Sequence, residues 1–430
     1  MDAYQKGPII GEGTYGSVIC ATHKASGRRV AIKKVRMASN REGVNMSVLR
    51  ELKALQALQG PHVVELLDVF TTKSSLVLVF EYMDCSLDDV IRDKATPLSP
   101  ADVKAYMQML LQGLAHVHDA GVVHRDIKPD NMLIGGDSTL KLADFGLARS
   151  VEAPCSSSDE AAKLTPQVFG RWYRPPELLM GCCHYGCPVD MWAAGCVLAE
   201  LLLRRPWFPG VCDMDQLDRI FKVLGVPTVQ SWPGMADLPH RIDFKPADGQ
   251  PLQQLFPQAS PECLDLLQQL MQFDPRHRIS AVAALQHPYF SSSPAPTQVA
   301  QLPRPTSGRG RRDLTVPAIM QDLLMRPAAV MRQQDAPAGF CGGGGSSSSR
   351  QLFAFSGQHS SFSGRIMSGQ GLQQGWPSAA GAAQGAEGML SSGSRLRLWC
   401  RAAALRQQEL MLRKVARVMP MQTMLTWLAL

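Results

Sequence analysis

Residues 124–131 read His-Arg-Asp-Ile-Lys-Pro-Asp-Asn, and residues 144–146 read Asp-Phe-Gly. Between them stand the short apolar runs 132–134 and 140–142, which predict a hairpin that carries both stretches. This region decides the fold, because such a hairpin would bring two carboxylates, an amide and a lysine onto neighbouring loops. Few chemistries other than transfer of a phosphoryl group from ATP use that set of side chains.

Each of these side chains has a distinct expected role. Asp126 is the candidate base, which orients an attacking hydroxyl and accepts its proton. Lys128 would neutralise the γ-phosphate, and Asn131 and Asp144 would supply hard oxygen ligands for Mg²⁺. Any one of them alone could be a loop cap or a turn residue. The complete set in this order favours catalysis.

A glycine-rich segment precedes the loops. Residues 11–18 read Gly-Glu-Gly-Thr-Tyr-Gly-Ser-Val, and glycines let a backbone approach phosphates that a Cβ would obstruct. A hairpin turn would give the same letters. Lys33 follows in Val-Ala-Ile-Lys, where a cation can hold the α- and β-phosphates, although a lone strand lysine is usually a surface residue. Glu51 on the next helical stretch could pair with Lys33.

The remaining pattern predicts an α+β fold of two lobes. Residues 4–83 are rich in strand signals, with one helical stretch at 48–58. From about Ser99, where Ser-Pro-Ala-Asp suits a helix cap, the spacing becomes helical, with helices suggested at 188–203, 213–224 and 260–273. We therefore predict a β-rich N-lobe over 4–83 and a larger helical C-lobe over 84–290.

The composition changes beyond these lobes. Residues 291–394 are predicted to be a low-complexity linker or tail, because runs such as the glycines and serines of 342–349 cannot bury a core. Apolar residues at helical spacing among arginines predict a basic amphipathic helix over 395–430, suited to a partner groove or an anionic membrane surface. A solvated helix, or a segment without an evolved role, explains the same pattern.

Charge and cysteine content exclude other classes of function. The 430 residues have a net charge of +7, but the basic excess lies beyond residue 303, so direct nucleic-acid binding by the lobes is not expected. The eleven cysteines have no regular spacing and the N-terminus lacks the apolar run of a signal peptide. We expect a soluble intracellular protein with free thiols and no membrane span.

The motifs together resemble the protein-kinase signature from residue 4 to about 290. Arg-Asp-x-Lys-Pro-x-Asn at 125–131 resembles serine/threonine kinases rather than tyrosine kinases. The stretch 171–177, Arg-Trp-Tyr-Arg-Pro-Pro-Glu, resembles the activation-segment ending of cyclin-dependent and MAP kinases. Residues 45–51 resemble a cyclin-contacting helix. The stretches 189–204, 215–221 and 301–305 are similar to the cyclin-dependent-kinase-activating kinase, the catalytic subunit of the general transcription factor's kinase module.

The resemblance implies a site for ATP and Mg²⁺ in which Lys33, Glu51, Asp126 and Lys128 are the catalytic residues. Phe80 would be the gatekeeper, and Glu81 and Met83 would form the hinge that receives adenine through backbone groups. The full set of expected nucleotide contacts is Ile10, Gly11, Gly13, Gly16, Val18, Ala31, Lys33, Phe80, Glu81, Met83, Asn131, Leu133 and Asp144.

Regulation by phosphorylation is also implied. Thr165 matches the position of an activating phosphate, which three arginine forks would order strongly. Without it these cations would repel one another, so a partner anion is expected. Thr14 and Tyr15 match the inhibitory sites of cell-cycle kinases. The three arginines that match the family's clamp are Arg50, Arg125 and Arg149.

The function implied is an ATP-dependent serine/threonine kinase that depends on a cyclin. It would phosphorylate serines and threonines of other cyclin-dependent kinases, of the C-terminal tail of RNA polymerase II, or of both. A cyclin-H-like subunit and an assembly factor are the implied partners, and the implied location is the nucleus and cytoplasm. A cell-cycle-related or MAP-like kinase is the alternative, although residues 164–167, Leu-Thr-Pro-Gln, lack the Thr-x-Tyr pair of MAP kinases.

A rival from another class is a catalytically weak scaffold that binds ATP. Gly170 supports it, because the family has at this position a threonine whose hydroxyl bonds near the catalytic aspartate and lysine. Loss of that hydroxyl would loosen Asp126. The intact catalytic set argues for an enzyme, since phosphoryl transfer is mostly positioning and charge stabilisation.

Overall fold

The structure, a computed structural model, describes residues 2–13, 16–36, 46–72, 75–151 and 163–305. Several predictions fall outside these ranges. They concern the phosphorylation sites Thr14 and Tyr15, the first residue of the cyclin-contacting stretch, the linker or tail beyond residue 305 and the amphipathic helix over 395–430.

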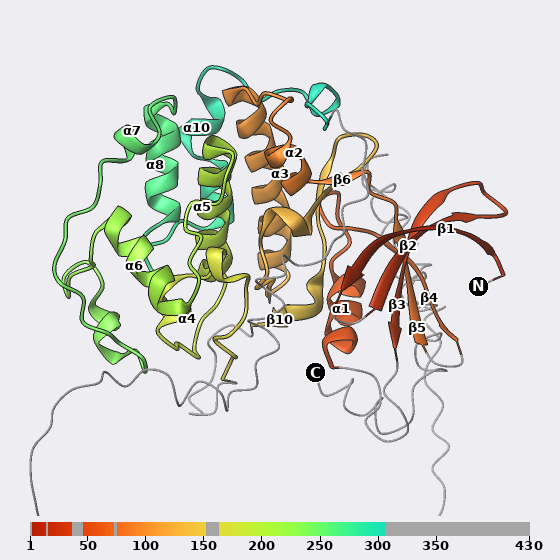
Figure 1. The fold of residues 1–430 in the computed structure, drawn as a ribbon, viewed down its shortest axis with the longest axis horizontal. Helices are drawn as coiled ribbons and strands as arrows, with labels where there is room; N and C mark the ends of the chain where they lie inside the picture. Colours follow the sequence, from red (N-terminus) through yellow and green to blue (C-terminus); the bar gives the residue numbers. More distant parts are fainter. Residues whose placement is uncertain (1, 14–15, 37–45, 73–74, 152–162, 306–430) are drawn as a thin grey trace, which may run out of the picture. The chain divides into compact units, whose positions relative to one another are not determined.

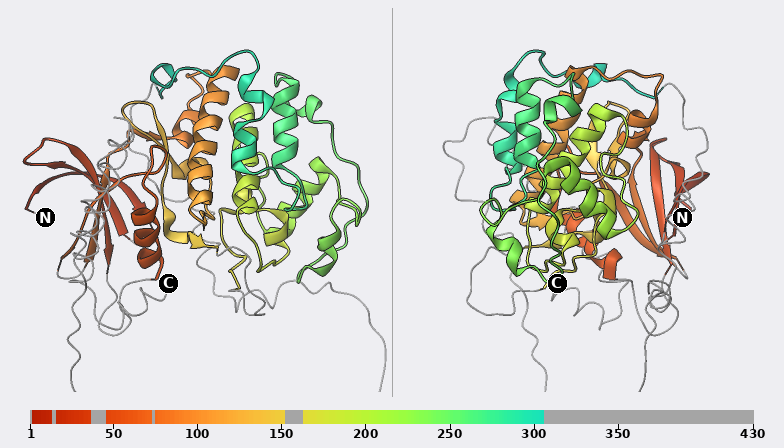
Figure 2. Two further views of the ribbon diagram at one scale, coloured as in Figure 1. Left: turned by 180° about the vertical axis from the view of Figure 1, so that it is seen from behind. Right: turned by 60° about the vertical axis from the view of Figure 1, so that its left-hand side comes forward.

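The N-lobe is an antiparallel sheet of order β1-β2-β3-β5-β4 with one helix, α1, on the side of the helical lobe (Figures 1 and 2). Alternation along the strands divides the core. Val77 and Val79 pack in a small cluster on the outer face, whereas Leu78 and Phe80 join the main core together with Leu52 of α1. The elements are β1 (Tyr4–Gly13), β2 (Gly16–His23), β3 (Arg29–Arg36), α1 (Met46–Ala57), β4 (Leu66–Thr72) and β5 (Ser75–Glu81).

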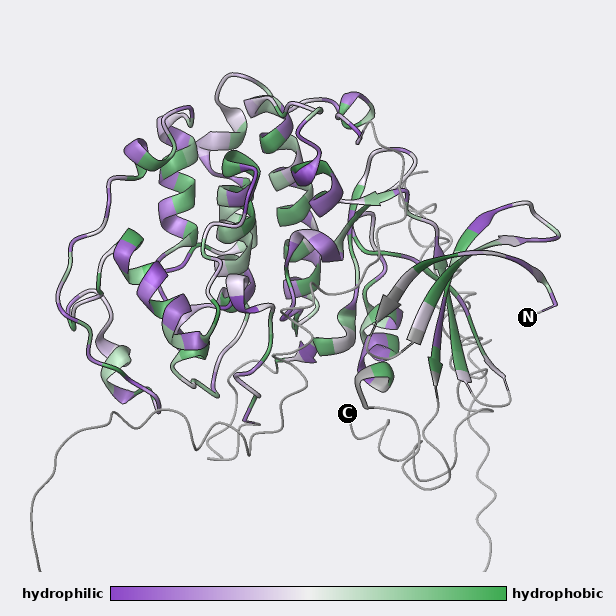
Figure 3. Cartoon of the chain, in the orientation of Figure 1, coloured by the Kyte–Doolittle hydropathy of each residue, from purple (hydrophilic) through white to green (hydrophobic). Residues whose placement is uncertain are grey.

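The C-lobe is mostly helical, as predicted. Its central helix α5 is hydrophobic along most of its length (Figure 3) and almost entirely buried, which a helix that is apolar all round requires. None of the helices in the described ranges is long and apolar enough to cross a membrane. The helices are α2 (Leu87–Arg92), α3 (Pro100–Asp119), α4 (Pro176–Leu179), α5 (Pro188–Leu203), α6 (Asp213–Leu224), α7 (Leu252–Leu255), α8 (Pro261–Leu270), α9 (Ala281–Leu285) and α10 (Pro288–Ser291).

Short strands and 3₁₀ turns carry the loops of the site. The predicted hairpin is present, because β8 pairs with β9 in antiparallel register. The short strands are β6 (Cys85–Ser86), β7 (Val122–Val123), β8 (Met132–Ile134), β9 (Leu140–Leu142) and β10 (Arg149–Ser150). The 3₁₀ turns are η1 (Pro129–Asn131), η2 (Phe145–Leu147), η3 (Arg171–Tyr173), η4 (Pro233–Asp237) and η5 (Val299–Gln301).

Residues beyond 290, the predicted end of the kinase domain, pack against α3 of the C-lobe. The side chain of Lys104 donates to the carbonyls of Ser292 (2.8 Å) and Pro294 (2.7 Å). Leu302 is buried, and the Tyr106 hydroxyl donates to the carbonyl of Pro303 at 3.0 Å. Residues 291–305 therefore belong to the C-lobe structurally, because α3 supplies the donors and the apolar surface that hold them.

Candidate active site

The loop between β7 and β8 is anchored by a carboxylate in the first turn of α5 (Pro188–Leu203). Asp190 is fully buried and accepts the backbone N–H groups of His124 (2.8 Å) and Arg125 (2.9 Å). Burial raises the pKa of Asp190, but its bond with His118 and the other donors outweigh this and hold it below the ordinary value. The ionised carboxylate thus fixes the loop backbone, including the positive φ of 68° at Arg125.

Asp126 is held by three donors from two segments, its own loop and the stretch around Gly170. Its Oδ2 accepts from the ammonium of Lys128 and from the amide Nδ2 of Asn131, both at 2.7 Å. Its Oδ1 accepts from the backbone N–H of Gly170 at 3.2 Å. Burial lowers the pKa of Lys128, but the charge of Asp126 raises it by more, so the net shift is upward and the lysine remains an ammonium. The structure brings these predicted residues together and orients the carboxylate.

Lys33 of β3 lies between two carboxylates. Its Nζ is 2.8 Å from both Glu51 oxygens, which α1 supplies, and 3.5 Å from Oδ1 of Asp144. Burial lowers the pKa of Lys33, but Glu51 and then Asp144 raise it more, and the net shift is upward. The pair therefore presents a fixed ammonium beside Asp144, the arrangement that holding the α- and β-phosphates requires.

The donor set fits Mg²⁺. Burial raises the pKa of Asp144, but Lys33 and Lys128 lower it more, so it is ionised, and its side chain is 52% exposed. Asn131 uses its amide nitrogen on the carbonyl and carboxylate of Asp126, which leaves its amide oxygen for a cation. Carboxylate and amide oxygens are the hard ligands that Mg²⁺ prefers.

The strand register aligns the residues expected around a nucleotide. The glycine-rich segment is the β1–β2 hairpin, in which Gly13 pairs with Gly16. Val18 lies opposite Lys33 and Ala31 lies opposite Phe80. The remaining expected contacts differ in burial: Met83 is buried, whereas Ile10, Gly11 and Leu133 are partly exposed.

The hinge prediction is refined at Glu81. Its carboxylate accepts from the ammonium of Lys141 (2.7 and 2.9 Å) and from the backbone N–H of Glu65 (2.7 Å). The Glu81 side chain thus supports the hinge. Its backbone N–H donates to the carbonyl of Glu65 at 3.1 Å, so the adenine contact that the resemblance implies would fall to the backbone carbonyl.

The predicted phosphate clamp is partly occupied by neutral acceptors. Arg125 donates through Nε to the carbonyl of Leu147 (2.6 Å) and through a terminal nitrogen to the Tyr185 hydroxyl (2.9 Å). Burial lowers the pKa of Arg125, and the nearby cation of Arg149 lowers it further. The Nε of Arg149 is buried and donates to no acceptor within the described ranges. Thr165 is exposed.

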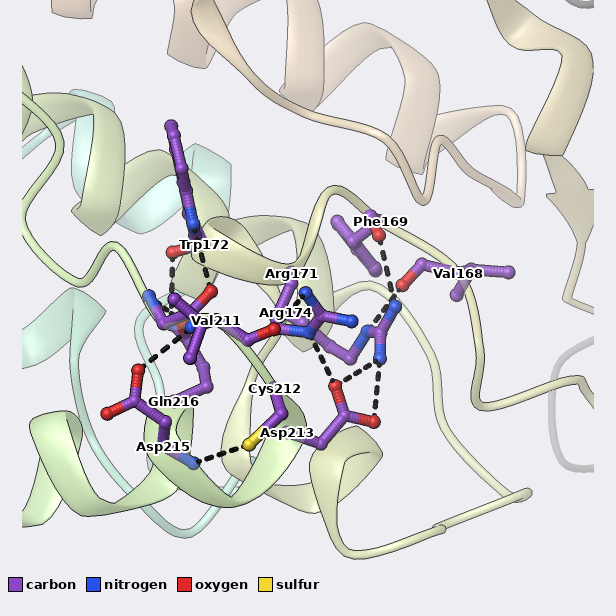
Figure 4. A network of polar contacts seen from close by, with 11 residues as sticks. Val168, Phe169, Arg171, Trp172, Arg174, Val211, Cys212, Asp213, Asp215 and Gln216 are labelled. Atoms are coloured by element: carbon purple, nitrogen blue, oxygen red, sulfur yellow. Dashed lines mark hydrogen bonds and ion pairs between the residues drawn. The ribbon is translucent and has the colours of Figure 1, made fainter. Parts of the chain in front are cut away.

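The end of the activation segment is fastened to the start of α6 (Figure 4). Arg171 and Arg174 both bind the carboxylate of Asp213, at 2.9 and 3.2 Å. Arg174 also donates to the carbonyls of Val168 and Phe169, where Phe169 has a φ of 68°. The segment beside Gly170 is therefore held by charge-assisted bonds as well as by packing.

The missing side chain of Gly170 is expected to matter little for turnover. An added Cβ would lie 3.5 Å from Tyr173 and 3.8 Å from Lys128, and the backbone bond to Asp126 would remain. We expect Gly170→Ala to keep kcat within about twofold, and Gly170→Thr to raise it by about two- to fivefold, because the hydroxyl adds a donor near a carboxylate. Steady-state kinetics on a protein substrate would measure this. A loss above about tenfold in Gly170→Ala would contradict it.

Glu200 makes stability depend on pH. Burial, with Asp88 and Asp130 nearby, raises its pKa to about 7, although the bond from the Tyr173 hydroxyl lowers it. Because the folded state holds the proton more tightly than the unfolded state, the protonated carboxyl contributes its full stability below the unfolded pKa of 4.5. That contribution is lost as the pH rises from 4.5 to about 7. We expect Glu200→Gln to remove this loss, which is about 3 kcal/mol of the free energy of unfolding. The variant should therefore have a higher melting temperature than the parent at pH 8. Denaturation at several pH values would test this. Parallel pH profiles of the two proteins would contradict it.

Comparisons with known proteins agree with this geometry. Residues 4–290 match the family model described as "Protein kinase domain". Cyclin-dependent kinase D-1 of Oryza sativa subsp. japonica is 48% identical over 341 residues, covering 79% of each chain. Cyclin-dependent kinase 7 of Xenopus laevis is 48% identical over 305 residues, covering 70% of this chain and 85% of the relative.

A solved structure is similar as well. A chain in the structure of the CAK complex from Chaetomium thermophilum, bound to ATP-gamma-S, is 40% identical and superposes with a TM-score of 0.65, covering 70% of this chain and 95% of that one. The chain belongs to the protein kinase family, as an ATP-using serine/threonine kinase of the cyclin-dependent type.

Proposed function

We propose that the chain is a cyclin-dependent-kinase-activating kinase that phosphorylates other cyclin-dependent kinases and the tail of RNA polymerase II. The observation that carries this proposal is the Lys33–Glu51 pair at 2.8 Å, because Glu51 lies on α1. A partner that contacts α1 therefore acts on the residue that holds Lys33. The kinship with Cyclin-dependent kinase 7 and with a chain of the CAK complex supports the same subgroup.

Mg²⁺ completes the proposed chemistry. Asn131 and Asp144 would hold it, and it would neutralise charge on the phosphates. Lys33 would bind the α- and β-phosphates and Lys128 the γ-phosphate. Asp126 would orient the acceptor hydroxyl and take its proton. Phe80, Glu81 and Met83 would receive the adenine.

The partners and regulation are proposed on the same basis. A cyclin-H-like subunit would bind at α1, and an assembly factor would stabilise the complex. Phosphorylation of Thr165 would add an anion for the three predicted clamp residues, Arg50, Arg125 and Arg149. The charge of Arg149 already lowers the pKa of Arg125. The nucleus and cytoplasm are the proposed locations, and the region beyond residue 305 is proposed to bind a partner or a membrane surface.

Partner choice tests the proposal. The purified full chain would be mixed with a cyclin-H-like subunit, with or without the assembly factor, or with an A-type cyclin. An inactive cyclin-dependent kinase and a MAP-kinase-type substrate would be offered to each mixture. We expect mixtures with the cyclin-H-like subunit, and not those with the A-type cyclin, to support phosphorylation. The inactive cyclin-dependent kinase should be the preferred substrate. Preference for the A-type cyclin or for the MAP-type substrate would favour the alternative kinase classes.

A further inference from the structure

The activation segment is tied to the catalytic loop through one tyrosine hydroxyl. Tyr185, in the loop between α4 and α5, accepts a hydrogen bond from Arg125 at 2.9 Å and donates one to the backbone carbonyl of Thr165 at 2.6 Å. Burial raises the pKa of Tyr185 above its ordinary value, although Arg125 lowers it. The hydroxyl therefore keeps its proton, which the bond to the Thr165 carbonyl requires.

Arg125 connects the two ends of the activation segment through this hydroxyl. Its Nε donates to the carbonyl of Leu147 at 2.6 Å, near the start of the segment. A second guanidinium nitrogen donates to the Tyr185 hydroxyl, which in turn donates to the carbonyl of Thr165 further along the segment. The backbone of Arg125 is fixed by Asp190 at 2.9 Å. The guanidinium group and the Tyr185 hydroxyl together thus connect Leu147 with Thr165, next to Asp126.

A second bond fastens the same end of the segment. The N–H of Leu164 donates to the carbonyl of Cys183 at 2.9 Å, and the Leu164 side chain is buried. Residues 164 and 165 are therefore held by the 183–185 loop at two points. A short distance along the chain, the N–H of Gly170 donates to Asp126, so residues 164–170 are attached to the 183–185 loop at one end and to the candidate base at the other.

We propose that Tyr185 is a positioning residue that does for the unphosphorylated segment what a phosphate on Thr165 would do. The hydroxyl gives Arg125 a partner and ties it to residue 165 without a negative charge. A phosphate on Thr165 would bind the arginines directly and make the hydroxyl redundant. This inference rests on the proposed phosphorylation of Thr165, and it predicts that the importance of Tyr185 depends on that modification.

The test is a double-mutant cycle in the full chain with its cyclin subunit. Tyr185→Phe would be compared in a Thr165→Ala background and in protein phosphorylated at Thr165. Amide hydrogen exchange at Leu164 and Val168 is the first readout, since it reports the segment whatever the substrate is. Steady-state kcat and the KM for ATP on a polymerase-tail peptide are the second.

In the Thr165→Ala background we expect Tyr185→Phe to speed exchange at Leu164 by about tenfold and to lower kcat by about tenfold, with the KM for ATP unchanged. In phosphorylated protein both effects should fall below about threefold. Equal effects in the two backgrounds, or none in Thr165→Ala, would overturn the proposal. If the peptide is not a substrate, the exchange data still decide, and only the proposed substrate fails.

A matched variant distinguishes loss of the Tyr185 hydrogen bonds from a general loss of stability. Tyr106→Phe also removes a hydroxyl that donates to a backbone carbonyl. That hydroxyl belongs to α3 and donates to Pro303 at 3.0 Å, not to the activation segment. It should leave exchange at Leu164 and kcat unchanged. Amides of α5 report global unfolding in every variant. Faster exchange in α5 of Tyr185→Phe, to the same degree as at Leu164, would mean that the tyrosine only supports the fold.

Discussion

Asp126→Asn is expected to lower kcat by about 10³-fold while the affinity for ATP stays within about twofold. The carboxylate is held by Lys128 and Asn131 at 2.7 Å and by the Gly170 N–H at 3.2 Å. An amide of the same size fills the same space but cannot take a proton from the acceptor hydroxyl. The Lys33–Glu51 pair, which would hold the phosphates, is not touched by the change.

A matched aspartate provides the control. Asp137 lies in the turn between β8 and β9, is exposed, and accepts from the N–H and hydroxyl of Thr139. Asp137→Asn should keep kcat within about twofold. Turnover by both variants would be measured at saturating ATP, and nucleotide affinity by calorimetry. Turnover of Asp126→Asn within about tenfold of the parent would contradict the role of the base.

Arg278→Ala is expected to lower the free energy of unfolding by about 3–5 kcal/mol. The Arg278 side chain is fully buried, and it bridges both carboxylate oxygens of Glu177 at 2.8 and 3.2 Å. It also donates to the carbonyls of Pro188 (2.7 Å) and Gln272 (3.0 Å). Its removal leaves a buried charge and carbonyl groups unpaired, which costs more than the loss of packing alone.

Chemical denaturation of the full chain would measure this effect. Arg241→Ala is the control, because Arg241 pairs with Asp243 at 2.8 Å but both side chains are well exposed. Exposed pairs of this kind contribute about 0–1 kcal/mol. Equal losses in the two variants would show that the Glu177–Arg278 pair has no special weight.

Motifs with local physical causes were predictable from the sequence. The hairpin of β8 and β9 follows from two apolar runs, and α3 begins at the predicted cap, where the Ser99 side chain accepts from the N–H of Asp102. The helices at 188–203 and 213–224 have the predicted bounds. In each case the signal lies within a few residues of the element that it produces.

The pairing of Lys33 with Glu51 was expected, but other contacts between distant segments were not predictable. Asp190 has a sequence signal, a charge at the start of an apolar helical run, but nothing in the sequence connects it with the N–H groups of residues 124 and 125. Tyr185 and Asp213 became visible as partners of arginines only in three dimensions. At Gly170 the missing hydroxyl suggested a loosened Asp126, whereas a backbone N–H, which no side-chain pattern reveals, donates to it.

The site around Asp126 is arranged to move a phosphate from ATP to a serine or threonine hydroxyl. The most direct measurement is phosphate transfer to a polymerase-tail peptide by the full chain with a cyclin-H-like subunit, followed by phosphoamino acid analysis. We expect phosphoserine or phosphothreonine whose formation requires Mg²⁺ and falls to background in Asp126→Asn. No transfer to this peptide or to an inactive cyclin-dependent kinase under any condition, with Asp126→Asn indistinguishable from the parent, would contradict it.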